Sequence, residues 1–384
     1  MILHLLKILF ALLLGASILL GCKKSPTCQL NEPAPAFQWN APVESPDERL
    51  TNFFIHGNEL YYGIGLNNPQ LVTVNTLDGS SQFSPAWEGL DRIDNFYVDG
   101  DYLYWNYRND IWRRNLAQLS NEKIGAIGYE FTDGYNEGHI RPFEGLVAGY
   151  FHEGSMTDRD YAIGLYDMAT QQELFRYQVN DPQVVTNLGD PAIGRTSSGD
   201  TIITFVETTK KALMIFNLSQ KDTLQIPLPD DDLYYPGLRN IHIRNGRVFV
   251  ALRFRVFCFD AGTGAKLWEL QEGEKIKVCT LRFWNDRLIF HSNSGILMSL
   301  DPNTGQILWQ NEPDDAGATD QVLIGDILYY STNPWDPDIL GIDINDGCKR
   351  VHLVDPMGSS GGIIGASGNG KLLIGSSNLL AYKP

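Results

Sequence analysis

Short apolar, aromatic-rich segments recur along this chain, and a pair of polar turn residues precedes each of them. The pairs are Gly57-Asn58, Gly100-Asp101, Glu144-Gly145, Gly199-Asp200, Asn245-Gly246, Asn285-Asp286, Gly325-Asp326 and Asn369-Gly370. They follow one another at intervals of 40 to 46 residues, with one longer interval of 55. Such pairs tolerate the positive φ that tight hairpin turns require. A period of roughly 40–45 residues with several short strands in each unit is typical of a β-propeller.

The fifth and sixth units show the full plan of four strands joined by hairpins. The fifth unit predicts strands over residues 240–244, 247–252, 256–260 and 265–270. The sixth repeats this plan over residues 280–284, 287–291, 296–301 and 306–310. Four such strands make one blade. The sequence therefore predicts an all-β, eight-bladed β-propeller of four-stranded antiparallel blades, with seven blades as the alternative because units two to four are divergent.

A shared motif links the third and fourth strands of these two units. It reads Asp260-Ala-Gly-Thr-Gly-Ala-Lys-Leu-Trp268 in one unit and Asp301-Pro-Asn-Thr-Gly-Gln-Ile-Leu-Trp309 in the next. Gly264 and its equivalent Gly305 are expected to adopt the left-handed conformation after the turn. The Asp and Thr side chains of each motif are expected to hydrogen-bond to the turn backbone. We expect the tryptophans to pack between neighbouring blades. The motif resembles the repeat of quinoprotein-type (PQQ-like) propellers, and degenerate copies begin at Asn75, Asp167 and Asp343.

The eighth unit stops at residues 379–383, after its third strand. An open sheet edge invites aggregation, so a fourth strand is needed from elsewhere. Residues 37–41 have the right length and carry Trp39, which could serve like Trp268. We predict that this N-terminal strand closes the last blade, giving one propeller domain over residues 37–384.

The N-terminal residues are those of an exported, lipid-anchored protein. Lys7 precedes an apolar stretch of signal-peptide length, which ends in Leu19-Leu20-Gly21-Cys22. This ending resembles the lipobox of bacterial lipoproteins, which implies a signal peptide over residues 1–21, lipidation of Cys22 and a flexible tether over 22–36. An ordinary secretory signal or a short membrane anchor is the alternative. Lys23 after the cysteine implies, by the same resemblance, the outer membrane with a periplasm-facing domain.

Charge and titratable residues narrow the function classes. The net charge of −16 disfavours nucleic acid and anionic membrane surfaces as partners. The histidines have no metal-ligand spacing, and the acidic run at residues 230–232 is expected to be a solvated loop rather than a calcium site. Cys258 and Cys279 stand in adjacent units; they either pair in a disulfide or are two small buried residues, the latter being favoured. We assign no catalytic residue, cofactor or metal.

The remaining alternatives are two kinds of binding protein and one kind of enzyme. Quinone-dependent dehydrogenases share this repeat, but they are longer, and the chain has no adjacent Cys-Cys pair. The short propellers of this class that lack a cofactor include the lipoprotein subunit of the outer-membrane β-barrel assembly machinery, which the chain resembles in architecture, lipobox and length. This resemblance implies a non-enzymatic, monomeric scaffold with an envelope protein or barrel-assembly component as partner. A glycan- or ligand-binding lipoprotein propeller is the alternative.

Two groups of residues are candidates for partner binding. The first is aromatic and lies in loops expected on one face, namely Tyr234, Tyr235 and Trp335, which either contact a partner or pack over the blade ends. The second is a basic arc on the innermost strands, namely Arg141, Arg195, His242 and Arg282, with Arg244 nearby and Thr196 at the equivalent position of unit four. The arc predicts a site for an anion or an acidic peptide. The alternative, which we favour, is internal pairing with Asp and Glu of neighbouring strands.

Overall fold

A computed structural model describes residues 35–42, 53–64, 70–83, 96–107, 110–116, 120–126, 140–155, 158–179, 191–229, 240–252, 255–271, 278–292, 296–311, 321–331, 338–354, 363–366, 369–375 and 378–383. These residues form strands β1 to β32 and turns, and they include no helix long and apolar enough to cross a membrane. The predicted signal peptide and Cys22 lie outside the described residues.

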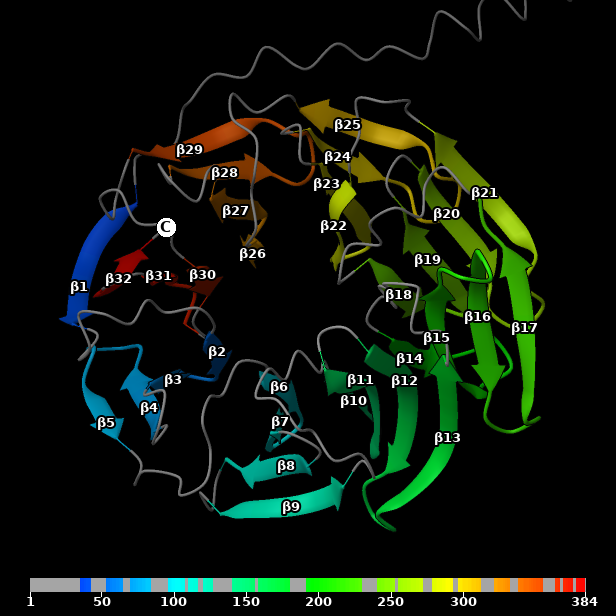
Figure 1. Cartoon of the computed structure of the whole chain (residues 1–384). Helices are drawn as coiled ribbons and strands as arrows, with labels where there is room; N and C mark the ends of the chain where they lie inside the picture. The colour runs from blue at the N-terminus through cyan, green and yellow to red at the C-terminus, as the bar shows by residue number, and fades with distance from the viewer. Residues whose placement is uncertain are drawn as a thin grey trace, which may run out of the picture.

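The strands form eight four-stranded antiparallel sheets arranged as blades around a ring (Figure 1). Blades 1 to 4 contain β2 (Phe53–His56), β3 (Glu59–Ile64), β4 (Gln70–Asn75), β5 (Ser81–Phe83); β6 (Phe96–Asp99), β7 (Tyr102–Tyr107), β8 (Asp110–Asn115), β9 (Asn121–Ala126); β10 (Ile140–Phe143), β11 (Leu146–Ser155), β12 (Asp158–Asp167), β13 (Gln172–Val179); and β14 (Ala192–Arg195), β15 (Thr201–Glu207), β16 (Ala212–Asn217), β17 (Asp222–Pro227).

Blades 5 to 8 continue the ring in the same order. They contain β18 (Ile241–Arg244), β19 (Arg247–Ala251), β20 (Arg255–Asp260), β21 (Lys266–Gln271); β22 (Val278–Trp284), β23 (Arg287–Ser292), β24 (Leu297–Leu300), β25 (Ile307–Asn311); β26 (Gln321–Ile324), β27 (Ile327–Ser331), β28 (Ile339–Asp343), β29 (Lys349–Leu353); and β30 (Ile363–Ala366), β31 (Leu372–Gly375), β32 (Asn378–Lys383) with β1 (Ala36–Pro42). The eight-blade prediction is confirmed and the seven-blade alternative is wrong.

The N-terminal strand closes the last blade, as predicted. The sheet order is β1-β32-β31-β30, with β1 antiparallel to β32. Trp39 pairs with Ala381 beside a break in register, and Trp268 pairs with Cys258 beside the same kind of break. The backbone position of Trp39 is therefore equivalent to that of Trp268. A strand from the start of the chain thus satisfies the edge that β32 would otherwise expose.

The hydrophobic core lies between neighbouring blades. One buried cluster joins Ile202 and Val206 of blade 4 to Val248 and Val250 of blade 5. Middle strands are covered on both faces, and β24 is buried at each of its four residues. The outer strand β17 instead alternates between exposed and half-buried positions. The middle strands of a blade are apolar throughout because neighbouring blades cover both of their faces. The outermost strand alternates because part of it faces solvent.

Six of the eight predicted turns are two-residue hairpin turns between the first and second strands of a blade. The fourth and eighth are not, because five residues separate β14 from β15 and β30 from β31. In the fourth, the Thr196 hydroxyl accepts a hydrogen bond from the Asp200 amide at 3.0 Å. Thr196 therefore lies in a loop, and the prediction that placed it on an innermost strand is wrong.

The predicted Asp-x-x-Thr-Gly loops sit beside these first turns. The Asp260 carboxylate accepts from the Thr263 amide and hydroxyl, each at 2.8 Å, and this hydrogen bonding lowers the pKa of Asp260. Ala261 then donates its amide to the Gly246 carbonyl at 2.9 Å, which ties the loop to the first turn of the same blade. We call the side of the ring formed by the first turns and these loops the turn face.

The tryptophans after these loops join neighbouring blades, as predicted. Trp268 donates its indole N–H to the Pro302 carbonyl of blade 6 at 3.0 Å. Its ring covers Gly305, where an added Cβ would stand 2.7 Å from the ring. Trp309 has the same relation to blade 7. Glycine is therefore required at positions 305 and 347 for two reasons: the backbone has a positive φ there, and the indole of the preceding blade leaves no room for a side chain.

Two of the cysteines that the structure describes differ in their chemical state. Cys258 is a free, buried thiol, and burial raises its pKa to about 12. A Cys258–Cys279 disulfide is therefore not formed, and the favoured interpretation of Cys258 as a small core residue is confirmed. Cys348 is disulfide-bonded, which the sequence reasoning did not predict.

Candidate functional site

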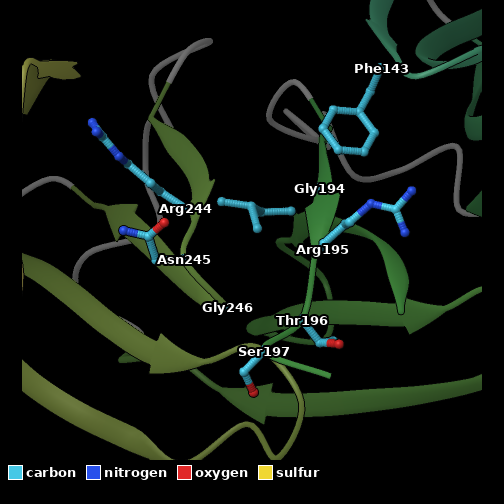
Figure 2. A pocket seen from close by; sticks show the side chains of 9 residues that line it. Phe143, Gly194, Arg195, Thr196, Ser197, Arg244, Asn245 and Gly246 are labelled. Atoms are coloured by element: carbon cyan, nitrogen blue, oxygen red, sulfur yellow. The ribbon is translucent and has the colours of Figure 1, made fainter. Parts of the chain in front are cut away.

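A pocket of about 550 Å³ lies on the turn face, where the ends of β10, β14 and β18 meet. Figure 2 shows Arg195 and Arg244 extending away from each other on opposite sides of it, with the ring of Phe143 at its upper side. The full lining is Phe143, Gly194, Arg195, Thr196, Ser197, Ile243, Arg244, Asn245 and Gly246. The pocket therefore combines apolar, hydroxyl, amide and guanidinium groups from blades 3, 4 and 5.

Close backbone packing forms the wall between blades 4 and 5. A Cβ on Gly194 would stand 2.7 Å from the Ile243 side chain, and a Cβ on Gly246 would stand 2.6 Å from the Ser197 amide nitrogen. Neither glycine has room for a side chain. The first turn of blade 5 is therefore seated directly on the longer loop of blade 4.

Replacing Gly246 with alanine is expected to lower the free energy of unfolding by about 2–4 kcal/mol. The substitution adds a positive-φ strain at φ +69 and a clash with backbone that no side-chain rotation relieves. Urea-induced unfolding followed by tryptophan fluorescence measures the change.

The matched control is Gly57→Ala, because Gly57 has φ +60 in an equivalent turn and nothing within 4 Å of an added Cβ. Only the backbone strain remains there, so the expected loss is about 1 kcal/mol. Equal losses at the two positions would contradict the close packing of blades 4 and 5.

Both arginines of the pocket are held by groups of neighbouring blades. Arg195 bonds to the Glu144 carboxylate of blade 3 and donates to the Gly199 carbonyl at 2.7 Å. The bond to Glu144 raises the pKa of Arg195. Arg244 donates to the Asn285 carbonyl at 2.6 Å and to the Asp286 carboxylate of blade 6 at 3.0 Å. The guanidinium charges are fixed at the pocket walls, and their carboxylate partners face solvent.

The other members of the predicted basic arc do not line the pocket. Arg141 is half-buried on β10. His242 bonds through Nε2 to the Leu281 carbonyl of blade 6, and Arg282 donates to the Gln321 carbonyl of blade 7 at 3.3 Å. These contacts link adjacent innermost strands. For Arg195 and Arg244, the favoured expectation of pairing with acidic neighbours agrees with the observed contacts.

Sequence reasoning named Arg195, Arg244 and Thr196 as members or neighbours of the basic arc, and Asn245-Gly246 as a turn, but did not predict a pocket between them. Phe143 and Ile243 lie on the strands beside the first turns, and no local motif marks them. The spacing that placed Arg195 near Arg244 was the available signal. The predicted aromatic residues Tyr234, Tyr235 and Trp335 lie outside the described residues.

The groups that line the pocket are suited to binding. Within the described ranges, no group of three or more His, Cys, Asp or Glu is placed to hold a metal ion. The hydroxyl groups in the lining are those of Thr196 and Ser197, and the Thr196 hydroxyl bonds to the Ser198 hydroxyl beside the pocket at 2.8 Å. A volume in this range and a mixed apolar and polar lining suit a small ligand or the side chains of a docked peptide.

Comparison with known proteins supports the repeat identified above. Residues 232–328 match a family described as outer membrane protein assembly factor BamB. The crystal structure of BamB from Moraxella catarrhalis superposes with a TM-score of 0.59 at 10% identity, covering 91% of this chain and 100% of that one. The chain is a PQQ-like β-propeller similar to BamB.

Other propellers share the fold without sharing the BamB description. The computationally designed Ika8 protein has a TM-score of 0.66 at 12% identity, covering 91% of this chain and 100% of its own. The WD40 propeller domain of Doa1 has a TM-score of 0.51 at 10% identity, covering 91% and 97%. Identities this low establish the architecture alone. No curated protein matches the sequence.

Proposed function

We propose that this chain is a non-catalytic, lipid-anchored scaffold that docks a protein partner through the pocket on its turn face. The observation that carries the proposal is the pocket itself, where Phe143 and Ile243 lie between two fixed guanidinium groups. The BamB-like repeat supports a protein-interaction role in general, because propellers of this kind serve as binding platforms.

The chemistry of the pocket specifies the partner segment. An apolar side chain fits against Phe143 and Ile243, and flanking carboxylates fit Arg195 and Arg244. The present partner of Arg244 is weakly held, since the Asp286 side chain is 99% exposed. Exposed ion pairs contribute little to stability, so a partner carboxylate replaces Asp286 at little cost. The segment expected is therefore acidic with one central apolar residue.

The proposed location is the outer membrane, with the domain facing the periplasm. Its support is the lipobox-like sequence Leu19-Leu20-Gly21-Cys22, the Lys23 that follows it, and the match to an outer membrane assembly factor. Cys22 would carry the lipid, and residues 23–35 would separate it from β1.

The double variant Arg195→Gln with Arg244→Gln is expected to weaken partner capture by more than about tenfold, because it removes two charge-assisted contacts. The measurement is affinity capture from solubilised outer membranes with the purified lipoprotein, quantified by mass spectrometry. Arg176→Gln is the matched control, since Arg176 pairs with Glu173 on the outer strand β13, away from the pocket.

Capture that is unchanged in the double variant, with an unchanged unfolding midpoint, would reject this pocket as the docking site.

Binding of a glycan is the second candidate function. It is favoured by the amide of Asn245 and the hydroxyl of Ser197 beside the ring of Phe143, a set of groups that suits sugar hydroxyls and a sugar face. Retention on a glycan array without protein capture would support that candidate.

A further inference from the structure

The N-terminal strand begins on the turn face. Phe37 pairs with Tyr382, and Tyr382 pairs with Leu372, the first residue of β31 after the loop from β30. The start of β1 is therefore at the same end of the blade as the first turns. Whatever precedes residue 35 reaches the domain from this side, so the turn face is the side nearest the proposed lipid.

Two large apolar side chains are exposed where the chain joins the domain. Phe37 on β1 is 55% exposed, and Leu77 in the blade 1 loop is 52% exposed. Lys371 connects the two blades there, because its ammonium donates to the carbonyl oxygens of Thr76 at 3.0 Å and Leu77 at 2.8 Å. We call Phe37, Leu77 and the neighbouring Tyr382 the junction patch.

The junction patch has the composition of a membrane-interface contact. The ring of Tyr382 packs edge-on against Phe37 with centroids 5.7 Å apart, and aromatic rings with a polar end favour the headgroup region. Lys383, which pairs with Ala36 across β1 and β32, is exposed and adds a positive charge next to the patch. The chain as a whole has a net charge of −16. The patch therefore places apolar side chains beside the ammonium groups of Lys371 and Lys383, with the exposed Asp78 carboxylate next to Leu77.

Exposed apolar residues elsewhere on the turn face provide a comparison. Leu267 and Ile307, at the starts of the outer strands of blades 5 and 6, are 46% and 36% exposed. Single exposed residues of this kind are normal on protein surfaces. What distinguishes the junction patch is its position at the attachment of the tether.

We propose that the junction patch lies in the headgroup region of the membrane that carries the lipid, so that the turn face is oriented towards that membrane. The inference rests on the proposed anchoring at Cys22. A segment as long as residues 23–35 reaches about 45 Å at most when fully extended. Such a tether holds the patch at millimolar effective concentration near the bilayer, so a contact too weak to bind alone is sufficient. The pocket then faces the membrane, which selects partners held at the same surface.

Hydrogen exchange measured by mass spectrometry tests the contact. The lipidated full chain, reconstituted on vesicles of phosphatidylethanolamine and phosphatidylglycerol, is compared with the Cys22→Ser chain in solution. Amides of residues 36–42 and 76–80 are expected to exchange about tenfold more slowly on vesicles, as burial of two half-exposed apolar side chains implies. The equivalent residues 266–271 and 301–307 are expected to be unaffected.

Matched substitutions separate the patch from a general surface effect. Phe37→Ser with Leu77→Ser is expected to abolish the slowing while the protein stays on the vesicles. Leu267→Ser with Ile307→Ser is expected to keep it. An acylated chain with no slowing at the patch would overturn the contact and leave the anchor intact. A mature chain without acyl mass on Cys22 would overturn the anchor and the contact together.

Discussion

Replacing Trp309 with alanine is expected to lower the free energy of unfolding by about 3–5 kcal/mol, the usual range for truncating a buried tryptophan. The side chain is 5% exposed and packs in the cluster that joins blades 6 and 7. Its indole N–H donates to the Ile344 carbonyl at 2.7 Å, and its ring covers Gly347, where a Cβ would stand 2.7 Å away. Alanine removes the packing and leaves the carbonyl of Ile344 without this donor. Urea-induced unfolding followed by far-UV circular dichroism measures the loss.

Two variants control this prediction. Trp309→Phe keeps most of the ring and removes the indole donor, so the expected loss falls to about 1–2 kcal/mol. Ile307→Ser changes an exposed residue on the same strand and is expected to stay within about 0.5 kcal/mol of the parent. A loss below about 1 kcal/mol for the alanine variant would show that the indole does not join the two blades.

Removing β1 is expected to open the ring. A chain that begins at residue 43 leaves β32 with an unpaired edge, since residues Asn378–Lys383 pair with Ala36–Pro42 in the intact protein. We expect a loss of at least about 3 kcal/mol and association through the exposed edge. Size-exclusion chromatography with light scattering measures the association, and thermal unfolding measures the stability.

The control for the truncation is a chain that begins at residue 35, which lacks the tether but keeps β1. It is expected to remain monomeric and to be more stable than the chain that begins at residue 43. A synthetic peptide of residues 36–42, added to the truncated chain, is expected to restore the monomer by occupying the vacant edge. A truncated chain that stays monomeric and equally stable would show that β1 is dispensable for closure.

The architecture was predictable because its determinants are local. A positive φ at Asn245-Gly246 and the side-chain bonds of Asp260 to Thr263 depend on residues adjacent in sequence. A closed ring then follows, because an unpaired third strand demands an edge partner. The strand boundaries of units five and six agree with the structure to within two residues. The exceptions are the fourth and eighth turns, where five-residue loops replace the two-residue turns that dipeptides such as Gly199-Asp200 predicted.

The pocket was not predictable in the same way. Its lining comes from three blades, and residues about 50 positions apart, such as Arg195 and Glu144, meet there. The spacing of units placed Arg195 and Arg244 near each other but not their side-chain directions. Those directions depend on which neighbouring carboxylate or carbonyl each guanidinium reaches, a choice that only the packing of blades determines.

By itself, the sequence determined the all-β propeller, its eight blades, the closing strand and the tryptophan contacts between blades. Turn conformation and hairpin pairing depend on residues that are close together in the sequence. Only the tertiary structure decided that Arg195 and Arg244 flank a pocket, that Cys258 has no disulfide partner, and that Phe37 and Leu77 are both exposed on the turn face. These features depend on distances between blades, which arise when the ring closes and which no single repeat encodes.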